Sequence, residues 1–213
     1  GGNSLAETIV AGMWVGGKVV EFLQGTNTVF NTGVIRDAHD KQVARIKALI
    51  SGANGRESAY AVRNAMFDTI MQGAGIFRNG TDLAASVTKL QEILQRARKV
   101  GLRSNGLGAN QELALALKIE GMVKLAQCVC YAALQRTESR GAHTREDYPE
   151  RNDRDWLNRT LATWANASDD LPTLNYEPAT KVFEIPPGER GYGGGKIIPM
   201  DNPPTATPKG AKA

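Results

Sequence analysis

The stretch that decides the fold is NQELALALKIEGMVKLAQCVCYAALQR, residues 110–136. It is rich in Leu and Ala, which favour helix over other backbone conformations. Residues 101–109, immediately before it, contain three glycines and are typical of a loop. We therefore predict one long helix from about Asn110 to Arg136.

Two further long helices are predicted upstream of this stretch, from about Arg56 to Met71 and from Thr81, as the capping residue, to about Val100. Residues 36–51 also show helical spacing. The inner faces of the two long helices are apolar at that spacing: Ala59, Val62, Met66 and Ile70 in the first, and Leu83, Val87, Leu90, Ile93, Leu94 and Ala97 in the second. Three long amphipathic helices with short connections favour an antiparallel bundle, and we assign residues 35–140 to it.

The chain opens with a predicted helix whose apolar residues are not confined to one face. Ser4 is a suitable N-cap, Glu7 would complete a capping box, and the apolar pattern continues to about Gln24. Apolar positions cover more than one face, which predicts burial on most sides. Nothing later in the sequence resembles a layer that could cover it. We therefore expect the chain to be the C-terminal part of a larger protein, with residues 1–34 closing a preceding domain.

Beyond the bundle the pattern changes. Residues 136–159 carry six arginines and six carboxylates, so their charges cancel, which favours a network of arginine–carboxylate pairs over a phosphate-binding patch. Two short strands, at 159–165 and 172–177, predict a hairpin. Residues 185–213 hold six of the nine prolines and predict an extended tail. The overall prediction is a mainly α protein with a small, irregular C-terminal domain, residues 141–213.

Composition excludes several classes of protein. A net charge of +4 is too low and too dispersed for a nucleic-acid-binding protein, and two cysteines exclude a disulfide scaffold. No apolar run reaches the ~18 residues that a membrane span needs.

Cys128 and Cys130 lie about 200° apart around a helix, so they cannot share a metal, and buried structural thiols are predicted.

Few residues suggest chemistry by themselves. The pattern favours a structural role for His143 inside the charged network and a solvated one for His39. GYGGGK, residues 191–196, departs from the phosphate-loop pattern and predicts a flexible turn. The amides that open the first helix could stabilise a negatively charged cofactor oxygen, or the helix could simply be a capped one.

Four phrases resemble the flavoprotein subunit of fumarate reductase and succinate dehydrogenase, with wording closest to bacterial quinol:fumarate reductases. They are GGNSLAE at residues 1–7, GIFR at 75–78, RTESRGAHTREDYPERND at 136–153 and DWLNRTL at 155–161. Their order and spacing fit the family across essentially the whole chain.

This resemblance implies that the backbone at Ser4 and Leu5, with Asn3 in the turn before them, contacts the isoalloxazine of an FAD shared with the missing N-terminal part. Reduced flavin carries negative charge near N1 and C2=O, which a helix N-terminus favours. The resemblance implies no catalytic and no metal-binding residue in this segment. The family's Gly-rich fingerprint, its flavin-linking histidine and its catalytic arginine are all absent from these 213 residues.

The resemblance also implies a place for the whole subunit. It would interconvert fumarate and succinate, and an iron–sulfur subunit and a membrane-anchoring cytochrome b subunit would carry electrons to or from quinone. The subunit would lie on the cytoplasmic side of the inner membrane as a peripheral protein. Two alternatives remain open on the residues alone: a non-catalytic helical interaction module, and a flavoenzyme related to L-aspartate oxidase.

Overall fold

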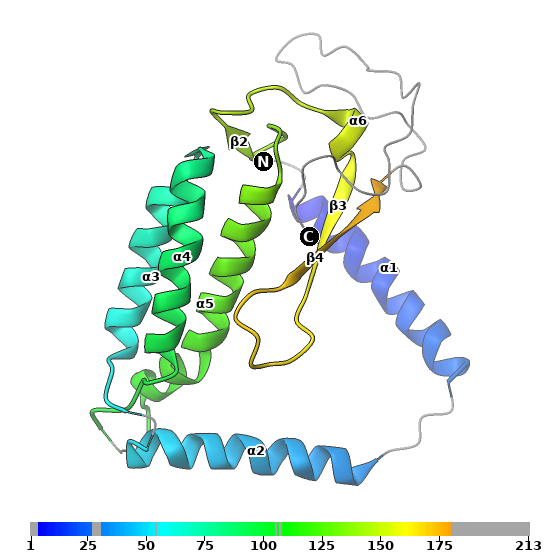
Figure 1. Ribbon diagram of the computed structural model, residues 1–213. Helices are drawn as coiled ribbons and strands as arrows, with labels where there is room; N and C mark the ends of the chain where they lie inside the picture. Colours follow the sequence, from blue (N-terminus) through cyan, green and yellow to red (C-terminus); the bar gives the residue numbers. More distant parts are fainter. Residues whose placement is uncertain (1–3, 27–30, 54, 105, 107, 180–213) are drawn as a thin grey trace. The chain divides into compact units, whose positions relative to one another are not determined.

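The computed structural model describes residues 4–26, 31–53, 55–104, 106 and 108–179, and the fold is mainly α (Figure 1). The chain forms two compact units, Gly1–Ala44 and Arg45–Ala213. The predicted tail and the GYGGGK turn lie outside the described residues.

The first helix, α1 (Ser4–Gln24), ends where the sequence predicts but starts differently. Ser4 is the first helical residue and not the cap before it, and its carbonyl accepts a bond of 2.8 Å from the Thr8 hydroxyl. The prediction of burial on most sides is wrong for this chain, because no side chain of α1 is buried. Leu5, Met13 and Trp14 are 79%, 77% and 66% exposed. The apolar faces that predicted burial therefore lie uncovered.

Helix α2 (Thr32–Ser51) starts four residues before the predicted position. The Asn31 side chain accepts a bond from the Gly33 amide at 3.0 Å, which satisfies a first-turn N–H and starts the helix early. Leu49, near the other end, is the buried residue of α2 and joins the core of the second unit.

The predicted bundle is confirmed as α3 (Ala59–Gly73), α4 (Gly80–Ala97) and α5 (Gln111–Gln135), which alternate in direction (Figure 1). Ser58 and Asn110 cap α3 and α5 by accepting from an amide three residues further on. Thr81 was expected to cap α4, but Asn79 does so, accepting from the Asp82 amide at 2.9 Å. Both residues suit a cap chemically, so the sequence alone could not separate them.

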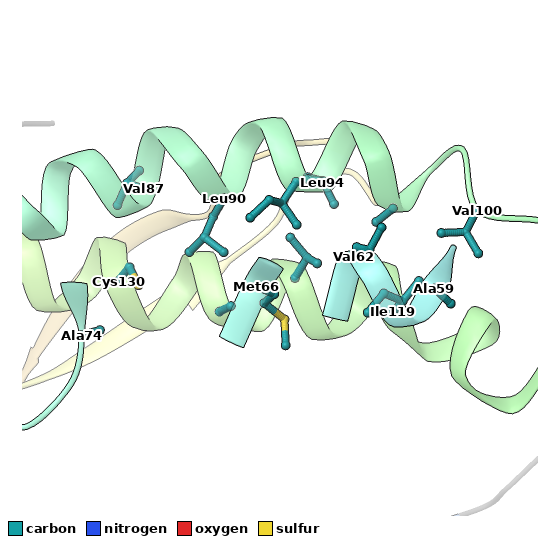
Figure 2. Packing of buried hydrophobic residues seen from close by; sticks show 14 of the residues in the cluster. Ala59, Val62, Met66, Ala74, Val87, Leu90, Leu94, Val100, Ile119 and Cys130 are labelled. Atoms are coloured by element: carbon teal, nitrogen blue, oxygen red, sulfur yellow. The ribbon is translucent and has the colours of Figure 1, made fainter. Parts of the chain in front are cut away.

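The bundle core is formed by the predicted apolar stripes. Figure 2 shows Leu90 and Leu94 of α4 pointing toward the side where Val62 of α3 and Ile119 of α5 lie. The helices α3 and α4 pack closely at one end, where a Cβ on Gly73 would lie 1.9 Å from the Ser86 hydroxyl oxygen. Only glycine therefore permits this helix contact.

Four short elements follow α5 in the described part of the chain. Strand β2 (Thr144–Arg145) pairs in parallel with β1 (Phe77–Arg78), a ladder that the sequence did not predict. A single helical turn, α6 (Asp153–Trp156), leads into the predicted hairpin. That hairpin is confirmed as β3 (Asn158–Thr163) paired antiparallel with β4 (Thr173–Pro178), with Thr160 opposite Tyr176.

Replacing Leu90 by Ala tests the bundle core. Leu90 is fully buried, so the cavity should lower the free energy of unfolding of the 213-residue chain by ~2–5 kcal/mol. Leu125→Ala is the matched control, because that leucine is 63% exposed and should change the value by less than ~0.5 kcal/mol. Chemical denaturation measures both, and equal effects would contradict this packing.

Candidate functional site

Two regions carry the residues that the sequence singles out. One is the first turn of α1, in the first unit. The other is the segment between α5 and the hairpin, residues 136–158, in the second unit.

The first turn of α1 contains two of the three predicted flavin-contact residues, Ser4 and Leu5, whereas Asn3 lies outside the described residues. The backbone amides of a first helical turn have no acceptor within their own helix, and the helix dipole places partial positive charge there. The Leu5 side chain is 79% exposed. The chemistry of this helix end suits an oxygen that gains negative charge.

The 136–158 segment contains the predicted arginine–carboxylate network, which the structure confirms. Its first part is centred on Arg145, which is 2% exposed. One nitrogen, Nη1, donates to the carbonyls of Ala133, Leu134 and Arg136 at 2.9–3.1 Å. The other two face Asp147, with Nε–Oδ1 at 2.7 Å and Nη2–Oδ2 at 2.8 Å. The guanidinium therefore satisfies the last carbonyls of α5 and one carboxylate together.

Asp147 extends this contact to a second helix. Its Oδ2 also accepts a bond of 2.9 Å from the Gly80 amide, the first residue of α4. The bidentate bond from Arg145 is the main cause that lowers the pKa of Asp147 to about 2. A cation at the C-terminus of α5 and an anion at the N-terminus of α4 both suit the helix dipoles. We call Arg145 and Asp147, with these bonds, the helix-end clamp.

A second cluster surrounds Glu138, which is fully buried. Its Oε1 accepts from Arg136 at 2.6 Å and from Arg140 at 2.8 Å. Its Oε2 accepts from Arg140 at 2.9 Å and from the Asn152 amide at 2.8 Å. A buried carboxylate needs this many donors, because losing its water would otherwise be very costly.

Arg136 connects the Glu138 cluster to the hairpin. It donates to the carbonyls of Trp156 at 2.9 Å and Asn158 at 2.8 Å, and its guanidinium stacks on the Trp156 ring at 4.9 Å. Trp156 is 1% exposed and its indole N–H donates to the Thr137 hydroxyl at 3.0 Å. These contacts hold the hairpin to the end of α5.

His143 has the predicted structural role and also a partner that the sequence did not reveal. Its Nδ1 lies 2.9 Å from Nη1 of Arg78, and since Arg has only donors, Nδ1 is the acceptor. Burial, followed by the charges of Arg78, Arg136 and Arg145, lowers the pKa of His143, although a bond to the Arg136 carbonyl opposes the shift. His143 is therefore a neutral acceptor that holds Arg78. Arg78 lies in the GIFR phrase, 65 residues away, and only that phrase pointed to it.

The other candidate residues have structural positions. Burial raises the pKa of the Cys130 thiol to about 11, as predicted for a buried structural cysteine, whereas Cys128 is only half-buried. His39 is exposed as predicted and lies 3.1 Å from Asp40.

Among the described residues, no three His, Cys, Asp or Glu side chains are grouped so that they could hold a metal. None of the described helices is long and apolar enough to cross a membrane.

Residues 63–192 match the family described as "Fumarate reductase flavoprotein C-term". The fumarate reductase flavoprotein subunit of Helicobacter pylori is 39% identical over 201 residues, which cover 93% of this chain and 28% of that protein. The succinate dehydrogenase flavoprotein subunit of Bacillus subtilis is 30% identical over 199 residues, covering 92% and 34%. This chain belongs to the fumarate reductase/succinate dehydrogenase flavoprotein family.

The fold agrees with this assignment. A structure of the quinol fumarate reductase of E. coli matches with a TM-score of 0.71 and 29% identity, over 80% of this chain and 29% of that one. The adenylylsulfate reductase of Archaeoglobus fulgidus, at 19% identity and a TM-score of 0.55, shares the fold alone. The chain spans between 28% and 34% of the length of the H. pylori and B. subtilis relatives.

Removing the guanidinium of the helix-end clamp should destabilise the chain strongly. Arg145→Ala removes the donor to three carbonyls at the end of α5 and the bidentate partner of Asp147, and each buried polar group left unsatisfied typically costs ~1–3 kcal/mol. Arg159→Ala is the control, because the Arg159–Glu177 pair is about half exposed, and exposed pairs contribute only ~0–1 kcal/mol. Denaturant unfolding distinguishes them. An Arg145→Ala chain with unchanged stability would show that the clamp is not structural.

Acidification should weaken the fold through His143. Its pKa is lower in the folded chain, so below pH 6.5 the unfolded chain binds a proton that the folded chain resists, and stability falls. The melting temperature should therefore drop between pH 7 and pH 5, a window above the ordinary titration of carboxylates. His143→Gln keeps an acceptor that does not titrate, and should reduce this drop. His39→Gln should leave the drop in melting temperature intact. A drop that His39→Gln reduces and His143→Gln leaves intact would refute the assignment to His143.

Proposed function

We propose that this chain is the C-terminal part of the flavoprotein subunit of a respiratory fumarate reductase or succinate dehydrogenase. The whole subunit would interconvert fumarate and succinate by hydride transfer between the C2–C3 bond and FAD. Electrons would be exchanged with quinone through an iron–sulfur subunit. The segment alone would be inactive, because no catalytic residue of the family is assigned to it.

The observation that carries this proposal is the family match over residues 63–192 together with 39% identity across 93% of the chain. The exposure of α1 adds independent support. The apolar residues of α1 lie on more than one face and none is buried, and monomeric proteins rarely expose large apolar patches. In the proposal, the FAD-binding part of the subunit covers this helix.

The residues at the start of α1 fit a flavin in chemistry. The backbone of Ser4 and Leu5, with Asn3 before them, would hold the pyrimidine side of the isoalloxazine. When bound, FAD supplies the hydride chemistry, and the contribution of α1 is to stabilise negative charge at its N-terminus. The sequence contains no Gly-rich dinucleotide fingerprint, so the remaining FAD contacts would come from other polypeptide.

We further propose three parts with separate tasks. Residues 1–34 end the FAD-binding domain, residues 35–140 form the helical domain, and residues 141–213 form a C-terminal domain that faces the iron–sulfur partner. The helix-end clamp and the Glu138 cluster would fix the third part to the second. Such a rigid arrangement suits a subunit that positions a redox partner, because geometry must be held where electrons pass.

The proposed partners are the iron–sulfur subunit and a membrane-anchoring cytochrome b subunit, and the proposed location is the cytoplasmic side of the inner membrane, as a peripheral protein. Two solved structures support this assembly. One that covers 76% of this chain at 27% identity is described as quinol-fumarate reductase with menaquinol molecules, and another as the Sdh1 complex of Mycobacterium smegmatis.

A titration with FAD tests the division of the cofactor site. The 213-residue chain should bind FAD weakly or not at all, since it would supply only one side of the flavin. The whole subunit, purified from its source, should contain flavin, reduce fumarate and co-purify with an iron–sulfur protein. Fluorescence quenching and flavin absorbance measure these properties. Submicromolar binding of FAD to the 213-residue chain would contradict the proposal, and so would a whole protein without flavin.

A further inference from the structure

An apolar groove runs along the outer face of α5, beside the loop that joins β3 and β4. It has a volume of about 820 Å³ and lies within the second unit. Its main lining residues are Arg45, Lys118, Gly121, Met122, Leu125 and Trp164. The hairpin loop is fixed beside the groove, because the Lys124 ammonium donates to the Ala167 carbonyl. The groove is therefore a formed surface and not a gap beside a loose loop.

The floor of this groove is an uncovered helix face. Other faces of α5 are buried in the bundle through residues such as Ile119 and Val123, which are fully buried. Leu125, which lines the groove, is 63% exposed, and Val129, one turn further along α5, is 45% exposed. Nothing lies within 4 Å of the position that a Cβ would take at Gly121, so another backbone could approach closely there. Exposed apolar residues at helical spacing are typical of a docking surface.

The rim of the groove is positively charged. Glu120 is compensated by Arg98 at 3.3 Å, and Lys124 is held by the hairpin loop. Arg45 and Lys118 have no carboxylate within ion-pair distance among the residues described in this chain. An apolar floor with two free cations fits an apolar segment that carries carboxylates. Two copies of this chain meeting through the same face would instead bring like charges together.

We infer that an apolar, carboxylate-bearing segment of the same polypeptide, from outside these 213 residues, covers this groove in the whole subunit. This inference rests on the proposed function. The H. pylori relative has 72% of its length outside the match, so a whole subunit holds ample polypeptide for this role. A segment in the same chain also acts at a high effective concentration, so a modest apolar contact with two ion pairs suffices to keep it in place.

Photo-crosslinking in the whole subunit tests this inference. The residue at 125 is replaced by benzoylphenylalanine, Leu125→Bpa, and the crosslinked peptide is identified by mass spectrometry after irradiation. The expected product is an intramolecular crosslink to a peptide that lies outside residues 1–213 and contains Asp or Glu. A crosslink to another subunit, to a second copy or within residues 1–213 would overturn the inference. No crosslink at all would also overturn it.

A charge reversal gives a second readout. Lys118→Glu should lower the melting temperature of the whole subunit, and should leave that of the 213-residue chain unchanged, because Lys118 is exposed there. Equal shifts in both proteins, or none in either, would contradict the inference. Flavin absorbance and fumarate reduction by the same subunit report separately on the proposed function. A subunit that contains flavin but crosslinks elsewhere overturns the groove assignment alone.

Discussion

One buried guanidinium determines how the second unit is held together. Arg145 donates to three carbonyls at the end of α5 and to both oxygens of Asp147, and Asp147 accepts from the first amide of α4. Two helix ends that would otherwise lose hydrogen-bonding partners are therefore satisfied by one ion pair. The β1–β2 ladder lies at the same place, since Arg78 of β1 pairs with Arg145 of β2. The Glu138 cluster lies in the same segment and joins the end of α5 to the hairpin through Arg136.

The clamp also explains why so many charges occur in the 136–158 segment. Burying Glu138 and Arg145 is costly unless every donor and acceptor finds a partner, and both residues have several. His143 takes part as a neutral acceptor for Arg78, which keeps a fourth positive charge out of a site that already contains three. The geometry is that of a structural joint between the helix ends and the hairpin.

The helices and the hairpin could be predicted from the sequence because they repeat. Leu90, Leu94 and their neighbours recur at helical spacing over several turns, and the hairpin strands are bounded by turn residues. The composition of the charged segment also predicted a network, but not which arginine pairs with which carboxylate. The β1–β2 ladder could not be predicted, since two-residue strands have no measurable period and the paired residues are 67 positions apart in the sequence. The contact between Arg78 and His143 was hidden for the same reason.

The proposed flavin contacts at Asn3, Ser4 and Leu5 have a different origin. Physical reasoning supplied a helix N-terminus that favours negative charge, and only the resemblance of GGNSLAE to flavoproteins proposed which ligand it meets. The exposure of α1 was missed because apolar faces predict burial only when the covering polypeptide is present. The same reasoning applies to the groove on α5.

The most direct test of this account is a double-mutant cycle between Arg145 and Asp147, with the free energy of unfolding measured for the 213-residue chain. Arg145→Ala, Asp147→Ala and the double variant are compared with the unmodified chain. The account predicts that the two losses are not additive, with a coupling energy of ~0.5–3 kcal/mol, because both residues act through one contact. Losses that add to within ~0.5 kcal/mol would contradict it, since they would show that the two helix ends are not joined through this pair.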